Sequence, residues 1–416
     1  MSTQPGPEFH SLPERPDLRH LKSQAKDLHR AGKAASLSDA QLKIARKYGF
    51  SSWPKLKSHV ESLQEIGQLK RSIDENDLPG LVALMTRNPA LHQAPLGYKD
   101  NGPLTWAAEC RGVLPSPERL EIVRWMLDNG SDIHQGGDGP LMRAALFDDR
   151  IPMMELLVER GADVNAMWDG RYPIIYAPCE TLQPQALRWL LQHGADPNTA
   201  TEDSGNCVQM LVATYWRDPA GKHACLEVFA EIGYSFPDTA PMAIHRGRID
   251  LLEACLERAP ALLRRHYAEA EIYPAELGIK TGDGLHTAPL DGATLLHMAV
   301  EHLEVEIAEW LIEHGADVNA RAAVDAEGFG GHTPLFQTVV SHFHQAEELA
   351  RLLLENGADP NVRATFRKQL RHMGDPDREK MHEFHNVTAT GFARQFQEPK
   401  WVNEQVLAVI RAHGGQ

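Results

Sequence analysis

The sequence predicts an all-α fold, a repeat solenoid of about nine helix-turn-helix units with a small helical cap at its N-terminal end. One observation is a joint that recurs as RGADVNA at 160–166, HGADPNT at 193–199, HGADVNA at 314–320 and NGADPNV at 356–362. The other is what surrounds the joint: amphipathic segments such as MMELLVER precede it and segments such as GHTPLFQTV follow it. Self-similarity at a fixed spacing indicates stacked units, each of which packs only on its neighbours.

The residue types of the joint explain why one helix ends there and another begins. Glycine stands where a helix C-cap needs left-handed backbone, and Asp and Asn favour turns because their side chains bond nearby backbone groups. The Thr and Pro of TPL suit an N-cap and a first helical turn. Gly130, Gly161 and Gly194 are 31 and 33 residues apart. Helix starts are therefore predicted near Gly102, Gly139, Tyr172, Cys207, Ala240, Thr294, Thr333 and Thr388, with one earlier unit near Ile66.

These joints, together with ATLLHMA at 293–299 and HTPLF at 332–336, resemble the ankyrin repeat family over roughly residues 66–416. RNPAL at 87–91 and RAPAL at 258–262 look like variants of the same joint. The resemblance implies a helical solenoid with hairpin-like fingers on one side. It also implies a scaffold that recognises proteins through its fingers and its concave groove.

The first 64 residues are expected to form a separate part. Residues 1–13 are polar and Pro-rich and are predicted to be disordered, and 14–64 are predicted to hold three helices that cap the array of 65–416. A solenoid needs a polar-faced cap over its exposed end, so Phe50 and Trp53 are expected to pack on the first repeat. The segment SDAQLKIARKYGFSSWPKLKSHVE resembles a leader that precedes bacterial ankyrin arrays. A helix-turn-helix DNA reader is the alternative, disfavoured because no Arg-rich recognition helix is visible.

Composition narrows the function class. Five cysteines without a C-x-x-C pair indicate buried thiols in a reducing cytoplasm. The N-terminus does not resemble a signal peptide and no run of 18 apolar residues occurs, so we expect a cytoplasmic protein with no membrane contact. Residues 1–70 contain twelve Lys and Arg against seven Asp and Glu, whereas the whole chain carries −15. The acidic remainder argues against nucleic acid as a partner, because phosphate contacts dominate that affinity.

Three consecutive fingers are longer than the others. Asn165 and Tyr172 are seven residues apart, whereas Asn319 and Thr333 are fourteen apart, and twenty-seven residues separate Asn361 from Thr388. A further insertion precedes the unit that starts near residue 294. Because insertions map to one face of a solenoid, we expect fingers 264–290, 320–332 and 362–387 to wall one binding pocket, with Phe329 on the middle finger. Three unrelated, flexible insertions are the alternative.

Histidines are concentrated in these fingers. Ten of the 21 histidines lie within 286–385, and His297 takes the structural position of the T-P-L-H pattern. No metal site or cofactor is expected, because no ligand-spacing motif such as H-E-x-x-H is present. A two-His-plus-carboxylate site remains the alternative. Its candidates are His332, His382 and His385 with Asp283, Asp325 or Glu327.

The concave groove offers the second set of candidates. The resemblance implies that the residue four positions after each helix start points into it, and aromatic and Arg side chains anchor many interfaces. Packing between helices is the equally weighted alternative for Trp106 and Tyr176. The predicted binding residues are Trp106, Arg143, Trp168, Arg171, Tyr176, His286, Phe329, His332, Gln337 and His372.

Two functions remain at this point. The first is a scaffold that binds a protein partner or a ligand. It is favoured because no nucleophile elbow, phosphate loop or Cys-His pair is present. The alternative is an enzyme with an acid–base or metal-assisted site between the groove and the His-rich fingers.

Overall fold

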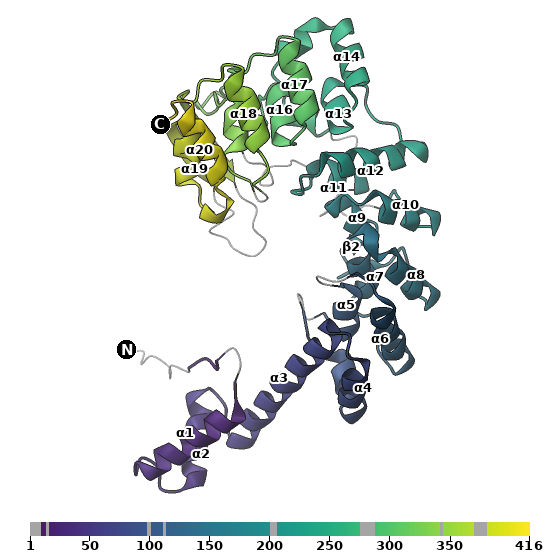
Figure 1. Ribbon diagram of the computed structural model, residues 1–416, viewed down its shortest axis with the longest axis vertical. Coiled ribbons are helices and arrows are strands. Elements are labelled where there is room, and N and C mark those ends of the chain that lie inside the picture. The colour runs from purple at the N-terminus through teal and green to yellow at the C-terminus, as the bar shows by residue number, and fades with distance from the viewer. Residues whose placement is uncertain are drawn as a thin grey trace. The chain divides into compact units, whose positions relative to one another are not determined.

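The computed structural model describes residues 10–13, 16–97, 101–110, 114–199, 206–274, 288–341, 344–369 and 381–416. These residues are mostly helical (Figure 1). Two compact units divide the chain: residues 1–144 with 152–162, and residues 145–151 with 163–416. No helix in the described part is long and apolar enough to cross a membrane.

The first unit contains the N-terminal helices and the first helix pairs. Its helices are α1 (Leu18–Arg30), α2 (Leu37–Lys47), α3 (Trp53–Asp74), α4 (Leu78–Arg87), the 3-10 helix η1 (Pro89–Gln93), α5 (Pro103–Ala108), α6 (Pro117–Asp128), α7 (Gly139–Ala144) and α8 (Ile151–Glu159), whose first residue belongs to the second unit. Capping side chains start several of them. Ser52, for example, accepts a hydrogen bond from the Lys55 N–H at the start of α3.

The leader has a hydrophobic core of its own, and this corrects the expected role of its aromatic residues. Leu21, Ile44 and Leu56 are buried in a cluster made by α1, α2 and the first half of α3. Phe50 and Trp53 pack against that cluster, not on the first repeat. They are better explained as completing the core of a small three-helix unit.

A continuous α3 crosses the boundary predicted at residue 64. The second half of α3 buries Leu69 and Ile73 and contacts α4 and α5. No helix begins near Ile66, so the predicted start there is wrong. The leader and the first repeat share one helix.

The second unit holds the remaining elements. Its helices are η3 (Asp148–Arg150), α9 (Tyr176–Thr181), α10 (Pro184–Gln192), α11 (Cys207–Ala213), α12 (Pro219–Glu231), α13 (Ala240–His245), α14 (Ile249–Arg258), η4 (Pro260–Arg264), α15 (Glu269–Ile272), α16 (Leu295–Glu301), α17 (Val305–Glu313), η6 (Pro334–Thr338), α18 (Glu347–Glu355), α19 (Ala389–Gln395), η7 (Pro399–Trp401) and α20 (Glu404–Ala412). The two helices of a pair, such as α16 and α17, contact each other. Each also contacts its counterpart in the next pair: α16 contacts η6, and α17 contacts α18.

The predicted helix starts agree with most of these boundaries. Thr294, Thr333 and Thr388 are N-caps of α16, η6 and α19. The start predicted near Tyr172 is wrong, because Tyr172 lies in a strand and α9 begins at Tyr176.

The asparagine of the joint connects neighbouring joints. The Asn319 side chain donates to the Gly357 carbonyl at 2.9 Å and accepts from the Asp359 N–H at 2.7 Å. Asn165 makes the same pair of bonds to Gly194 and Asp196. A single amide thus satisfies one carbonyl and one N–H of the next joint, which explains why Asn follows Gly-Ala-Asp.

Two antiparallel hairpins correct the all-α prediction to a mostly helical fold. β1 (Met167–Trp168) pairs with β2 (Tyr172–Pro173), and β3 (Ala364–Gln369) pairs with β4 (Met381–Val387). The second hairpin lies in the long finger 362–387, with Phe366 opposite Phe384. Both of these rings are buried and each contacts Phe392 of α19, so the hairpin packs on the repeat core.

All five cysteines are buried and none forms a disulfide. Burial raises the pKa of the Cys179 and Cys225 thiols. Such thiols stay protonated and unreactive, which agrees with the sequence prediction of buried free cysteines.

Candidate functional site

Hydrogen bonds join the middle finger to each of the other two enlarged fingers. The His266 side chain of the first finger donates to the Arg321 carbonyl of the middle finger at 2.9 Å, and the Ala323 N–H donates to the Gly292 carbonyl, just beyond the first finger, at 2.9 Å. The Gly330 N–H donates to the Thr365 carbonyl of the third finger at 2.6 Å, an isolated antiparallel bridge. The middle finger is therefore bonded to both of the others.

Glycine is required at two close backbone contacts of Ala323 in the middle finger. Gly330 has φ +138°, and a Cβ there would lie 2.0 Å from the Ala323 carbonyl oxygen. Gly292 has φ +71°, and its Cβ would lie 2.8 Å from that of Ala323. Gly328 has φ +90° but no atom within 4 Å of a Cβ. The glycines at 292 and 330 thus permit close backbone contact.

A pocket of about 290 Å³ opens where the three fingers meet. Its lining residues come from all three fingers and the residues that follow the first: Glu269, Pro289, Leu290, Asp291, Gly292, Ala323, Val324, Asp325, Phe329, Gly330, His332, Phe366, Arg367 and Met381. Val324 is 60% exposed and Met381 is 47% exposed, both large values for apolar side chains. We call this hollow the finger pocket.

Arg367 organises one wall of the finger pocket. Its guanidinium forms ion pairs with Asp325, at 2.8 Å, and with Glu327. The same guanidinium lies 4.7 Å from the centre of the Phe329 ring, in cation–π geometry. The Phe329 N–H donates to Asp325, a bond that lowers the pKa of that carboxyl. Phe329 is therefore held by local contacts even though glycines flank it.

His332 forms part of the buried wall. Its Nε2–H donates to the Pro289 carbonyl at 2.9 Å, and its own carbonyl accepts a bond from His297. Burial lowers the pKa of His332 to about 4, so the ring is neutral at physiological pH. Because Nε2 carries the proton, Nδ1 is an acceptor, and it has no hydrogen-bond partner.

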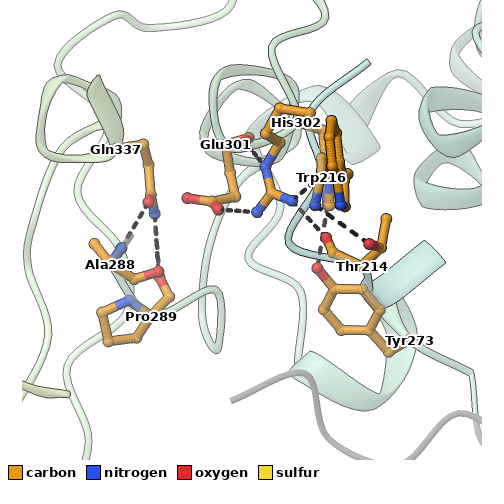
Figure 2. Close-up of polar contacts among 9 residues, drawn as sticks. Thr214, Trp216, Tyr273, Ala288, Pro289, Glu301, His302 and Gln337 are labelled. Carbon is orange, nitrogen blue, oxygen red and sulfur yellow. Dashed lines mark hydrogen bonds and ion pairs between the residues drawn. The ribbon is translucent and has the colours of Figure 1, made fainter. Parts of the chain in front are cut away.

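Gln337 fixes the backbone that follows the first finger. Its Oε1 accepts from the Ala288 N–H at 3.0 Å, and its Nε2 donates to the Pro289 carbonyl at 3.3 Å (Figure 2). The side chain is only 2% exposed. Gln337 therefore shapes the finger pocket from behind and does not reach a partner, contrary to its predicted binding role.

A buried polar network lies beside this region and was missed from the sequence. Arg217 donates to the Glu301 carboxylate at 2.7 Å and to its carbonyl at 3.0 Å, and both side chains are buried. Tyr273 and His302 share a hydrogen bond of 3.1 Å (Figure 2). The residues of the Arg217–Glu301 pair are 84 positions apart, so no local pattern indicates that they meet.

A second buried ion pair belongs to the same set of helices. Lys222 of α12 contacts Glu304 at 2.7 Å, and His223 contacts the same carboxylate at 2.9 Å. Burial lowers the pKa of Lys222, and Glu304 opposes this shift. These pairs join the α11–α12 unit to the α16–α17 unit, which identifies them as contacts between repeats.

The predicted groove residues belong to both compact units. In the first unit, Trp106 is half-buried and donates to Asp74 at 2.8 Å, and Arg143 is half-buried. In the second unit, Tyr176 is 1% exposed and belongs to the core, a correction of its predicted binding role.

The remaining groove candidates lie at the first hairpin. Trp168 is buried against Tyr172 in that hairpin. Arg171 is exposed and stacks on Tyr172. Of the other candidates, His286 and His372 lie outside the described residues, as does Asp283.

The alternative metal ligands are not brought together. His332 uses its Nε2 on the Pro289 carbonyl, and His385 bonds Glu383 at 3.0 Å. Among the residues whose placement is described, no three His, Cys, Asp or Glu side chains are grouped to share a metal ion.

Comparison with protein-family models gives a match. The family model described as "Ankyrin repeats (3 copies)" matches residues 104–201 and 203–364, which is more than half of the chain. No curated protein matches the sequence. With its joint asparagines, stacked helix pairs and matched family model, the chain belongs to the ankyrin repeat family.

Proposed function

We propose that the chain is a binding scaffold and that a protein partner docks at the finger pocket. The observation that carries this proposal is the pair of exposed apolar side chains, Val324 and Met381, on the lining of a hollow walled by three hydrogen-bonded fingers. Apolar side chains presented on a fixed framework are typical of recognition surfaces.

The size of the finger pocket favours a protein over a free small molecule. Small-ligand pockets span about 300–1,000 Å³ and enclose most of their ligand. At about 290 Å³, the finger pocket lies at the lower end of that range. Its volume suits one or two side chains of a partner, which is how a few anchor residues dominate protein interfaces.

A photo-crosslinking experiment tests the location of the interface. A photoreactive amino acid replaces Val324 in one variant and Leu114 in a control, because Leu114 is 64% exposed and lies outside the finger pocket. We expect the Val324 probe alone to crosslink one cellular protein. Equal crosslinking from both positions, or none from either, would contradict the proposal.

Affinity measurements with the captured protein complete the test. Val324→Asp and Met381→Asp should each weaken binding by about tenfold or more, because an anchor residue contributes about 2 kcal/mol. Leu114→Asp, the control, should bind as the unaltered chain does. All three variants should keep the helical circular dichroism spectrum, because these side chains are exposed.

A further inference from the structure

We propose that the finger pocket receives a lysine or arginine side chain of the partner, flanked there by apolar residues that cover Val324 and Met381. This inference rests on the proposed function and specifies the chemistry of the occupant. Two features carry it: the balance of charge on the lining, and the exposed apolar side chains next to it.

The first feature is the charge of the lining. Glu269, Asp291 and Asp325 supply three carboxylates, and Arg367 supplies the one guanidinium among the lining residues. Arg367 is already paired with Asp325 and with Glu327, which lies next to the lining. The lining therefore carries a net negative charge, which attracts a cation and disfavours an acidic occupant.

Asp291 is the carboxylate best placed to meet an incoming cation. Its side chain is exposed, and Oδ1 accepts the Glu269 N–H at 2.9 Å. Its second oxygen has no protein partner among the described residues. Asp325, by contrast, is used by the backbone of its own loop and by Arg367. Asp291 can therefore pair with a ligand without breaking a contact of the fold.

The second feature separates a peptide from a free amine. Val324 and Met381 present exposed apolar surface, which a small cation cannot cover. A peptide whose basic side chain enters the finger pocket covers both with its neighbouring residues. Long basic side chains also bury their methylene groups along apolar surface while the charged end meets the carboxylates.

A peptide selection on the full-length chain tests this inference. A phage library of random peptides is first depleted of the peptides that bind the Val324→Asp variant. The remaining peptides are then selected for binding to the unaltered protein. We expect the survivors to share a Lys or Arg between apolar residues. Replacing that residue with norleucine or citrulline in the synthetic peptide should weaken binding by about tenfold, the effect of losing a charged partner at an interface.

Asp291→Asn supplies the matching change in the protein. Asparagine keeps the oxygen that accepts the Glu269 N–H, so the fold stays intact while the charge is lost. We expect Asp291→Asn to bind the basic peptide about tenfold more weakly than the unaltered protein does. The uncharged peptide should bind Asp291→Asn and the unaltered protein with equal affinity. Asp317→Asn is the control: Asp317 also accepts one backbone bond, from the Asn319 N–H, and lies outside the finger pocket. This control should leave affinity unchanged.

The outcomes separate the two proposals. Peptides that require Val324 but tolerate the norleucine or citrulline replacement and Asp291→Asn would overturn the basic-residue inference and leave the proposed function standing. A selection that yields no peptide dependent on Val324 would overturn both.

Discussion

Replacing Gly330 with alanine tests whether the three fingers form one hydrogen-bonded framework. The new Cβ would lie 2.0 Å from the Ala323 carbonyl oxygen, a backbone atom that cannot rotate away. The φ of +138° is also a conformation that L-residues rarely adopt. The backbone around Gly330 must therefore shift away from Ala323 of the same finger, and this breaks the 2.6 Å bond from the Gly330 N–H to Thr365 of the third finger.

The size of the effect follows from these contacts. Backbone strain at such a φ costs about 1–3 kcal/mol, and loss of the inter-finger hydrogen bond costs about 1 kcal/mol. We expect the fingers of Gly330→Ala to open about 2–4 kcal/mol more easily. Gly328→Ala is the control, since it has a positive φ but open space around its Cβ. It carries only the strain, about 1–2 kcal/mol.

Hydrogen exchange followed by mass spectrometry measures this difference. Amides of the middle finger, such as Ala323 and Gly331, should exchange about 10–100-fold faster in Gly330→Ala than in Gly328→Ala, because about 1.4 kcal/mol corresponds to a factor of ten. Amides of α16 and α18 should exchange at unchanged rates. If amides of the middle finger exchange at equal rates in the two variants, the bond from Gly330 to Thr365 does not hold the fingers together, and the framework argument is wrong.

Three further predictions concern stability. Glu301→Gln should destabilise the second unit by about 3–5 kcal/mol, because it leaves Arg217 buried without its counter-charge, and urea denaturation that shows less than 1 kcal/mol would contradict a buried ion pair. Leu56→Ala should lower the free energy of unfolding of the leader core by about 2–5 kcal/mol. The expected readout is a lower denaturation midpoint for leader amides only, and a midpoint lowered for the whole chain would refute a separate core. Stability should also fall as pH is lowered: burial depresses the pKa of His332 to about 4 and of His297 to about 3, so the unfolded chain binds protons first, below about pH 6.5. His332 alone would contribute about 3 kcal/mol to the free energy of unfolding above pH 6.5, and this contribution is lost as the pH falls toward 4. Urea midpoints that do not change between pH 7 and pH 5 would exclude burial of both rings.

The joints show what a local pattern predicts well. Glycine caps, N-cap threonines and the joint asparagine each act within a few residues or on the equivalent residues of the next unit. Thr294 and Thr333 were therefore predicted correctly as helix starts, and the finger insertions were visible as spacing alone. The same reasoning failed at Ile66, because apolar positions within α3 serve two cores in succession and no cap residue separates them.

The site was predictable only in outline. Spacing indicated three long neighbouring fingers, but not that the third is a β-hairpin whose Phe366 and Phe384 enter the core. The side-chain roles depend on contacts that spacing does not encode. Gln337 bonds backbone 49 residues away, and Arg217 meets Glu301 across 84 residues. Tyr176 was predicted to face the groove because it lies four residues after the expected helix start at Tyr172, but α9 begins only at Tyr176.

The continuous α3 has a consequence for how strain passes between the leader and the repeats. Between Val60 and Leu69, the helix buries no residue, and Gly67 lies near the C-terminal end of this stretch. Glycine in a helix interior is about 1 kcal/mol less favourable than alanine, and a short stretch of helix is marginal without tertiary packing. Here the helix is supported by the cores at its two ends and by two polar side chains: Gln64 donates to the Pro16 carbonyl, and Glu65 accepts from Arg87 and Asn88. The eight residues between the two cores are the least buried part of α3, so we expect bending of this helix to concentrate there.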